Sequence, residues 1–262
     1  NFRQPFRGRR ATAAGGDANA GAGNGTGNGD GDNASAGTGG NVNGFDLKNQ
    51  VDFYKQRYNL KDPYTKLVGN SGNGDDNLYG VRNFRVVLHG IYYRGGANNV
   101  FNKYGKRGNS NPLPDVGLKN LCEEGFSEAD YLYPTNYAQA PHSVRCTNVQ
   151  RQDVDFKYLQ VTSLTSGNEK KILTQVWNHI KGKIPGPMYA HCWNGWHASG
   201  YAAAISLKQF CGWNADQADA YWVKNTDGVS VGYDSVRKKV RDFQPFPDLK
   251  ITTDEKNMIC PQ

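Results

Sequence analysis

The chain has 262 residues, enough for one substantial core with extensions, and a formal net charge of +7 at pH 7. No run of about 18 apolar residues occurs, which excludes a conventional membrane-spanning helix. The basic residues are scattered outside the first ten positions and no RNA- or DNA-binding motif occurs, so we expect no nucleic-acid partner. The charge then indicates a mildly basic surface; attraction to an acidic polymer such as a polysaccharide is the alternative.

Residues 1–44 differ in composition from the rest of the chain. Arginine and phenylalanine are frequent in residues 1–10, and residues 11–44 are almost all Gly, Ala, Asn, Asp, Ser and Thr. Such a segment buries too little apolar area to offset its ordering entropy. Small side chains permit close backbone approach, so we expect an extended arm that links copies of the chain, for instance as an added strand. Docking onto its own domain is the alternative.

A helical lead-in is predicted for residues 45–80. Asp46 can cap a helix there. The apolar face of that helix consists of Leu47, Val51, Tyr54 and Tyr58. Residues 69–77 are rich in Gly, Asn and Asp, and their spacing does not match a calcium-binding loop, so we expect a solvated loop.

The main domain is predicted at residues 81–245 as alternating strands and helices. Residues 83–96 predict two strands around a turn at Gly90. A helix capped by Asp115 should follow, then a strand near Tyr131 to Tyr133. Residues 134–155 are polar and contain proline, and they predict a long loop.

The second half of the main domain continues this alternation. Phe156 to Val161 predicts a strand, and Asn168 is expected to cap a helix. The apolar stripe of that helix consists of Ile172, Leu173, Val176, Trp177 and Ile180. The alternation predicts an α/β fold with a mostly parallel central sheet flanked by helices on both faces.

One stretch combines a strand, a loop and a helix around a cysteine. The apolar run from Met188 to Ala190 ends in His191 and Cys192, and a polar loop with a glycine follows. Ser199 and Gly200 then open an alanine-rich helix that extends to Phe210. A cysteine so placed sits near a helix N-terminus, where free backbone N–H groups favour a thiolate and can hold an anion.

Further helices are predicted after this stretch. Asn214 and Gln217 form a capping-box-like start, with Ala218, Tyr221 and Trp222 inside. Another helix is expected from Asp234 to Phe243. Residues 246–262 are predicted to form an irregular surface tail that Cys260 anchors.

The cysteine stretch resembles the signature loop of the cysteine-dependent protein tyrosine and dual-specificity phosphatases. That signature consists of His-Cys, five residues, Arg, Ser or Thr, and Gly. The residues in register are His191, Cys192, Gly195, Ser199 and Gly200. Ala198 stands where the family has arginine. The segments Asn83-Phe84 and Tyr93-Arg94-Gly95-Gly96 are similar to the first strands of bacterial and fungal members, and Arg94 is expected to serve structure.

The resemblance implies a reaction that this sequence is poorly equipped to perform. In the family, the cysteine attacks phosphorus, the arginine binds the phosphoryl oxygens, and an upstream aspartate protonates the leaving oxygen. The side chain of Ala198 cannot bind phosphate. The position where the family has its aspartate falls at Val161 to Ser163, which contains no carboxylate. Asp153 and Asp155 lie too early, before the predicted strand. Losing one anion-stabilising donor costs about 10²–10³ in rate and losing a general acid about 10²–10⁴. We therefore predict the fold without the usual turnover.

The resemblance also assigns roles to the other loop residues. His191 is expected to orient the loop by hydrogen bonds, and Ser199 is a further catalytic candidate. His197, one position early, is the alternative source of positive charge, although imidazolium lacks the planar fork of arginine. Trp193 and Trp196 are expected to pack at the pocket mouth, or alternatively to stack on a sugar or aromatic ligand. The predicted anion-binding loop comprises Trp193, Asn194, Gly195, Trp196, Ala198 and Gly200.

Five cysteines occur in the chain, and four remain if Cys192 is the loop thiol. Four cysteines allow three pairings, and we predict the two that join neighbours along the chain. These are Cys122 with Cys146 and Cys211 with Cys260. The alternative is four buried thiols in a cytoplasmic protein. No spacing typical of zinc ligands occurs, so no metal or cofactor is expected.

Three hypotheses for the function follow. In the leading one, a catalytically inactive phosphatase-fold protein serves a structural role outside the cell or at its surface, linked to copies of itself through residues 1–44, even into a filament. The chain begins at Asn1 rather than Met, as an exported and processed product would. The second hypothesis is an active cysteine-dependent phosphatase with a phosphocysteine intermediate on Cys192. The third is a binding module for a phosphate or sulfate ligand.

Overall fold

Six strands form one sheet in the computed structural model, which describes residues 44–98 and 112–262. The sheet order is β1-β2-β6-β3-β5-β4. The strands are β1 Val81–Leu88, β2 Tyr92–Ala97, β3 Glu128–Tyr131, β4 Ser143–Thr147, β5 Asp153–Gln160 and β6 Met188–Cys192. The inner pairs β2–β6, β6–β3 and β3–β5 are parallel, and the outer pairs β1–β2 and β5–β4 are antiparallel. The predicted mostly parallel sheet is confirmed. Except for Gly44, the predicted arm lies outside the described residues.

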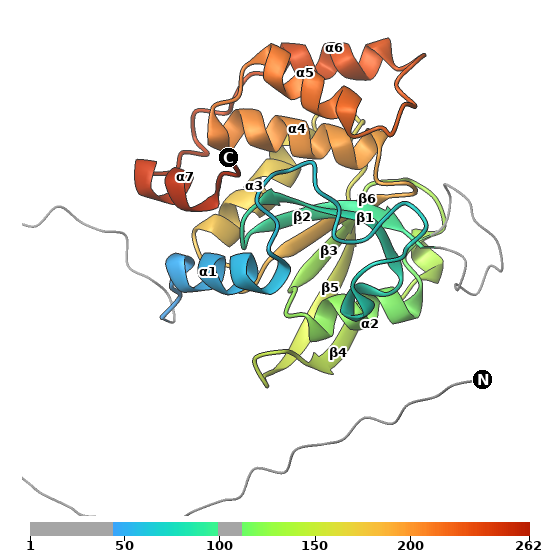
Figure 1. The fold of residues 1–262 in the computed structure, drawn as a ribbon, viewed down its shortest axis with the longest axis vertical. Helices are drawn as coiled ribbons and strands as arrows, with labels where there is room; N and C mark the ends of the chain where they lie inside the picture. Colours follow the sequence, from blue (N-terminus) through green and yellow to red (C-terminus); the bar gives the residue numbers. More distant parts are fainter. Residues whose placement is uncertain (1–43, 99–111) are drawn as a thin grey trace, which may run out of the picture. The chain divides into compact units, whose positions relative to one another are not determined.

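Helices cover both faces of the sheet, as Figure 1 shows for α4, α5 and α6 on one side and α2 on the other. The helices are α1 Leu47–Tyr58, α2 Asp115–Glu123, α3 Asn168–Ile180, α4 His197–Cys211, α5 Ala215–Lys224, α6 Asp234–Asp242 and α7 Thr253–Ile259. Short 3₁₀ turns occur at η1 Asp76–Leu78 and η3 Tyr137–Gln139.

Alternation along the strands divides the core into two layers. Tyr92, Met188 and Ala190 pack with α3 and α4, whereas their strand neighbours Tyr93 and Tyr189 pack with α2. All of these side chains are buried. Successive side chains of a strand point to opposite faces, so the period of two assigns each residue to one layer.

The edge of the sheet differs from its prediction. The strand expected at Tyr131 to Tyr133 spans Glu128–Tyr131 instead, and the loop expected at 134–155 contains β4 and the start of β5. Residues of β4 alternate between exposed and half-buried. This edge hairpin therefore carries little apolar signal in the sequence.

Several helix ends also differ from prediction. Asp115 and Asn168 are the first residues of their helices rather than the caps, and the side chain of Asn168 donates to Thr162 instead. Helix α4 begins at His197, two residues before the predicted Ser199. The tail predicted to be irregular contains α7, which a capping box of Thr252 and Glu255 starts. The caps predicted at Asp46 and Asn214 are both formed.

Two disulfides join the predicted pairs. Cys122 of α2 bonds to Cys146 of β4, and Cys211 at the end of α4 bonds to Cys260 beyond α7. Cys192 is the free cysteine and is buried. The predicted pairing is confirmed, and each link is expected to contribute about 3–4 kcal/mol by constraining the unfolded chain.

Candidate anion-binding site

Cys192 lies at the carboxyl end of the parallel strands, where β6 passes into α4. It is the last residue of β6, and α4 begins five residues later at His197. The predicted order of strand, loop and helix is therefore present. The structure also brings the predicted pair together, because the Cys192 thiol lies 3.6 Å from the Ser199 hydroxyl and is only 7% exposed.

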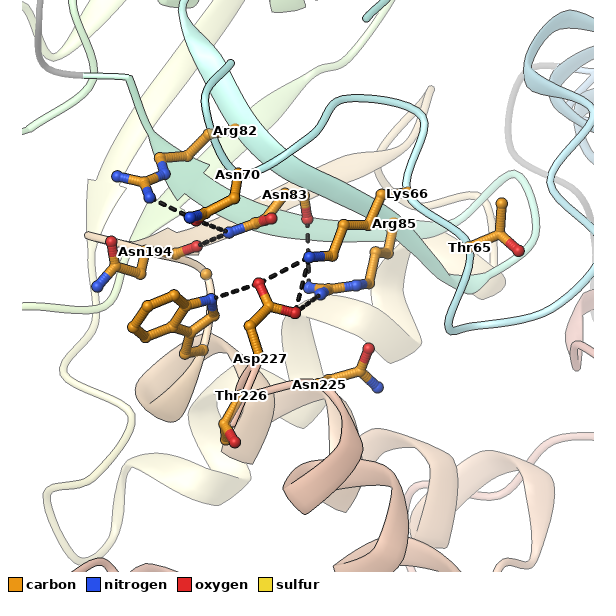
Figure 2. A network of polar contacts seen from close by, with 12 residues as sticks. Thr65, Lys66, Asn70, Arg82, Asn83, Arg85, Asn194, Asn225, Thr226 and Asp227 are labelled. Atoms are coloured by element: carbon orange, nitrogen blue, oxygen red, sulfur yellow. Dashed lines mark hydrogen bonds and ion pairs between the residues drawn. The ribbon is translucent and has the colours of Figure 1, made fainter. Parts of the chain in front are cut away.

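Three successive carbonyl groups of the loop are held from the side of β1 and β2. The carbonyl of Trp193 accepts from the backbone N–H of Ala97 at 2.9 Å. That of Asn194 accepts from the Asn83 side-chain amide at 2.6 Å, a contact seen in Figure 2. That of Gly195 accepts from the Arg94 guanidinium at 2.5 Å. Each carbonyl thus points toward the first two strands.

The N–H groups of the loop consequently face the other way. In a trans peptide the C=O and N–H point in opposite directions, so the N–H groups of residues 194–196 are directed away from β1 and β2. None of the N–H groups of residues 194–198 donates a hydrogen bond to another described residue. Those at 197 and 198 belong to the first turn of α4, where N–H groups have no partner within the helix. The loop therefore carries five N–H groups without a hydrogen-bond partner among the described residues.

Glycines make this close packing of loop and strand possible. A Cβ at Gly96 would lie 2.2 Å from the carbonyl oxygen of Trp193, and one at Gly195 would lie 2.4 Å from the carbonyl carbon of Gly95. Gly195 also has a φ of +77°, which side chains disfavour. The two segments that carry the family resemblance are thus packed against each other.

A cavity of about 220 Å³ opens at Cys192 and Asn194. Its remaining walls are Trp193, Trp196, His197, Val229 and Tyr233. Trp193 and Trp196, which were expected at the pocket mouth, both line this cavity. Val229 and Tyr233 were not predicted as site residues, because the loop between α5 and α6 shows only a turn signal at Asn225 to Gly228.

His197 forms part of the cavity wall. Its Nε2–H donates to the carbonyl of Val229 at 2.6 Å, and its ring stacks on Tyr233 at 3.7 Å between centroids. Burial lowers the pKa of His197 below its ordinary value. The ring is therefore largely neutral at pH 7 and brings little positive charge to the cavity.

His191 is fixed beneath the loop by two hydrogen bonds. Its Nδ1 lies 3.1 Å from the carbonyl oxygen of Cys192 and its Nε2 lies 2.8 Å from the Tyr158 hydroxyl. Because a carbonyl only accepts, Nδ1 carries the proton and Nε2 accepts from Tyr158. Burial lowers the pKa of His191 to about 4, which keeps the ring neutral. This geometry suits the orienting role that the resemblance implies, which stays a prediction.

The positions of the family's arginine and aspartate hold other groups. Ala198 is 6% exposed, and its carbonyl accepts from the buried Ser163 hydroxyl at 2.9 Å. Asp153 and Asp155 lie at the start of β5, within the strand rather than before it as expected. Residue Gln160 at the other end of β5 pairs with Tyr131, which also pairs with His191, so both aspartates lie far from the Cys192 end.

Asp227 is the carboxylate beside the cavity wall, and it is ion-paired. It accepts from the Trp196 indole N–H at 3.0 Å and from Lys66 at 2.6 Å, and Arg85 lies 3.5 Å away. Figure 2 shows Lys66 and Arg85 converging on it. Burial alone would raise the pKa of Asp227, but Lys66, Arg85 and Trp196 together lower it. Asp227 is therefore charged at neutral pH and has no proton to donate to a leaving group.

The arrangement suits the binding of a small anion beside a thiol. Within residues 44–98 and 112–262, no group of three or more His, Cys, Asp or Glu could hold a metal ion. Nor does any helix of this part combine the length and apolarity needed to cross a bilayer.

Comparisons with known proteins add little to this geometry. No protein-family model matches the chain, and no curated protein matches it. Among solved structures, the core catalytic domain of the PP-IP phosphatase SIW14 from S. cerevisiae, in complex with citrate, shares 15% identity with a TM-score of 0.42. The match covers 68% of this chain and 95% of that one, and a likeness of this size carries no argument about activity. The strand, loop and helix around Cys192 lie on a mostly parallel sheet flanked by helices, which is the arrangement expected from the sequence.

Proposed function

We propose that this domain binds a small tetrahedral anion at the Cys192 loop and does not turn over phosphate monoesters at rates typical of cysteine-dependent phosphatases. The observation that supports binding is the orientation of the loop. Its three carbonyls at residues 193–195 are tied to β1 and β2, which leaves its N–H groups for a ligand. Backbone N–H groups at a helix N-terminus are a common protein site for sulfate and phosphate.

The same site lacks the groups that would complete hydrolysis. The Ala198 side chain offers no hydrogen bond to a phosphoryl group, and the cavity walls contain no carboxylic acid. The combined loss is expected to slow the reaction by about 10⁴-fold or more.

Titration of inorganic sulfate and phosphate into the full chain tests the binding, measured by calorimetry. We expect one saturable site per chain. Carboxymethylation of Cys192 places a carboxylate in the cavity, so it should abolish the heat signal, and the four other cysteines are protected as disulfides. An absence of saturable binding at tens of millimolar would contradict the proposal.

A structural role outside the cell, with copies linked through residues 1–44, is a second proposal. Two disulfides favour an oxidising compartment. The composition of the arm favours an extended segment that gains order by pairing with another chain. Electron microscopy of the full chain and of a variant without residues 1–44 tests this role, and assemblies that persist after the deletion would contradict it.

A further inference from the structure

Two arginine side chains are buried directly behind the anion-binding loop. Arg94 of β2 has no exposed surface and Arg85 of β1 is 1% exposed. Arg94 donates one N–H to the Gly195 carbonyl and another to the Tyr221 hydroxyl at 3.0 Å. The Nε groups of both arginines are buried and have no hydrogen-bond partner among the described residues. Burial of two guanidinium groups at such a place is costly unless negative charge compensates it.

The neighbouring carboxylate does not balance this charge. Asp227 is shared by Arg85 and Lys66, and Arg94 forms no ion pair with a described residue. Arg94, Arg85 and Lys66 thus bring three positive charges against the one negative charge of Asp227.

The buried carboxyl groups of β3 do not supply the missing negative charge. Asp130 pairs across the sheet with Ala190, which pairs with Arg94 on its other side. Burial raises the pKa of Asp130 to about 8, with a further contribution from Glu128, so Asp130 is mostly neutral at pH 7. Glu128 already faces His179, at 3.1 Å.

We propose that Arg94, with Arg85 behind it, replaces the arginine missing from the loop as the positive charge that holds the bound anion. This inference rests on the proposed anion binding and names the residues that set its strength. Arg94 is a positioning residue, since it acts through the Gly195 peptide from the far side of the loop. Its charge lies at the carbonyl end of the peptide between Gly195 and Trp196, whose N–H is directed away from Arg94. A cation at a peptide oxygen polarises the peptide and strengthens its N–H as a donor.

Charge variants separate this role from a purely structural one. Arg94→Met and Arg85→Met remove a cation, and Arg94→Lys retains the charge while losing the two-pronged contact. Asp227→Asn removes the one carboxylate but keeps an oxygen that can accept from Trp196. Arg57→Met is the matched control, because Arg57 pairs with Glu124 at the end of α2.

The readout is the dissociation constant for inorganic sulfate by calorimetry, at two ionic strengths, on full-length variants that circular dichroism shows to be folded. We expect Arg94→Met to weaken binding about tenfold or more, and Arg85→Met less. Arg94→Lys should recover part of the loss. Asp227→Asn should tighten binding, and Arg57→Met should leave it unchanged even if it lowers the melting temperature.

Two failures can be told apart. If wild-type protein binds no sulfate, the proposed function fails. If wild-type protein binds sulfate and the arginine variants bind equally well, or if Asp227→Asn weakens binding as much as Arg94→Met does, the assigned role of the arginines is wrong. If Arg94→Met does not fold, Arg94→Lys and Asp227→Asn still test the role of the arginines. A purely structural role of Arg94 predicts no increase in the sulfate affinity of Asp227→Asn.

Discussion

The two sides of the Cys192 loop are built from different chemistry. On the side of β1 and β2, every carbonyl of residues 193–195 has a donor, and two buried arginines lie behind them. On the side where β5 leads into α3, the buried Ser163 hydroxyl donates to the Ala198 carbonyl. The first side carries buried positive charge, whereas the second holds the loop through a neutral hydroxyl.

This difference separates two tasks that one loop performs in an active phosphatase. Anion binding depends on backbone N–H groups and on charge behind the loop, whereas turnover needs a guanidinium in the loop and an acid opposite. A chain can keep the first set of groups after the second is lost. The predictions below test each side in turn.

Gly96→Ala should have the largest effect, because its Cβ would lie 2.2 Å from the carbonyl oxygen of Trp193 and 2.5 Å from the carbonyl carbon of Asn194. The backbone must separate to accommodate it, and we expect a loss of about 4 kcal/mol in the free energy of unfolding. Sulfate binding should be lost as well. The control is Gly69→Ala, whose nearest neighbour would be at 3.5 Å, and its stability should stay close to wild type in urea titrations.

Removal of the Cys211–Cys260 disulfide should lower the free energy of unfolding and leave sulfate binding unchanged. The link closes a separation of 49 residues, so Cys211→Ser with Cys260→Ser should cost about 3 kcal/mol in the free energy of unfolding. The sulfate dissociation constant of the folded variant should change less than about twofold, since neither cysteine lies at the loop. A parallel loss of sulfate affinity would show that the loop depends on the C-terminal anchor.

The buried Asp130 of β3 predicts a pH dependence of stability. Burial raises the pKa of Asp130 to about 8 in the folded chain, above its ordinary value of 3.8, so the folded state favours the protonated carboxyl. Its contribution is complete below the unfolded pKa and is lost as the pH rises through the folded one. Between pH 6.5 and 8 the contribution of Asp130 to the free energy of unfolding should fall by about 1.5 kcal/mol.

Asp130→Asn is the control for this pH dependence, since an uncharged amide should remove the decline. His191 and His89 act in the opposite sense, because burial lowers each folded pKa to about 4 whereas the unfolded imidazole titrates near 6.5. Each should raise the free energy of unfolding by about 0.4 kcal/mol between pH 6.5 and 8, and this rise should remain in Asp130→Asn. An unchanged slope in the variant would show that another group titrates.

The smallest effect is expected on the side of Ser163. Ser163→Ala removes one buried hydrogen bond to the Ala198 carbonyl and should cost about 1 kcal/mol. Sulfate affinity should remain within about twofold of wild type, because no N–H group of the loop is disturbed.

Asn83→Ala is the matching substitution on the side of β1 and β2. It frees the Asn194 carbonyl, so it should weaken sulfate binding.

Much of this architecture could be predicted from the sequence where local signals are strong. The strand that ends in Cys192 has a short apolar run, and the cap at Asn214 has its partner Gln217 three residues later. The edge strand β4 was not predicted, because its residues alternate between exposed and half-buried and form no apolar run.

The site was predicted only in part, for a physical reason. The loop residues could be named from their order along the chain. The hydrogen bonds from Arg94 and Asn83 to the loop carbonyls could not be predicted. About a hundred residues separate these side chains from the loop, and only the fold brings them together. Arg94 was expected to serve structure alone. Its lack of a counter-charge appears only when the burial of its neighbours is known.

The most direct test of the account is hydrolysis of an aryl phosphate by the full-length protein, compared with Cys192→Ser under identical conditions. We expect no hydrolysis above the Cys192→Ser background, while the same preparation binds sulfate at one site. Rapid turnover that disappears in Cys192→Ser would contradict the account, because the loop would then process the anion as well as hold it.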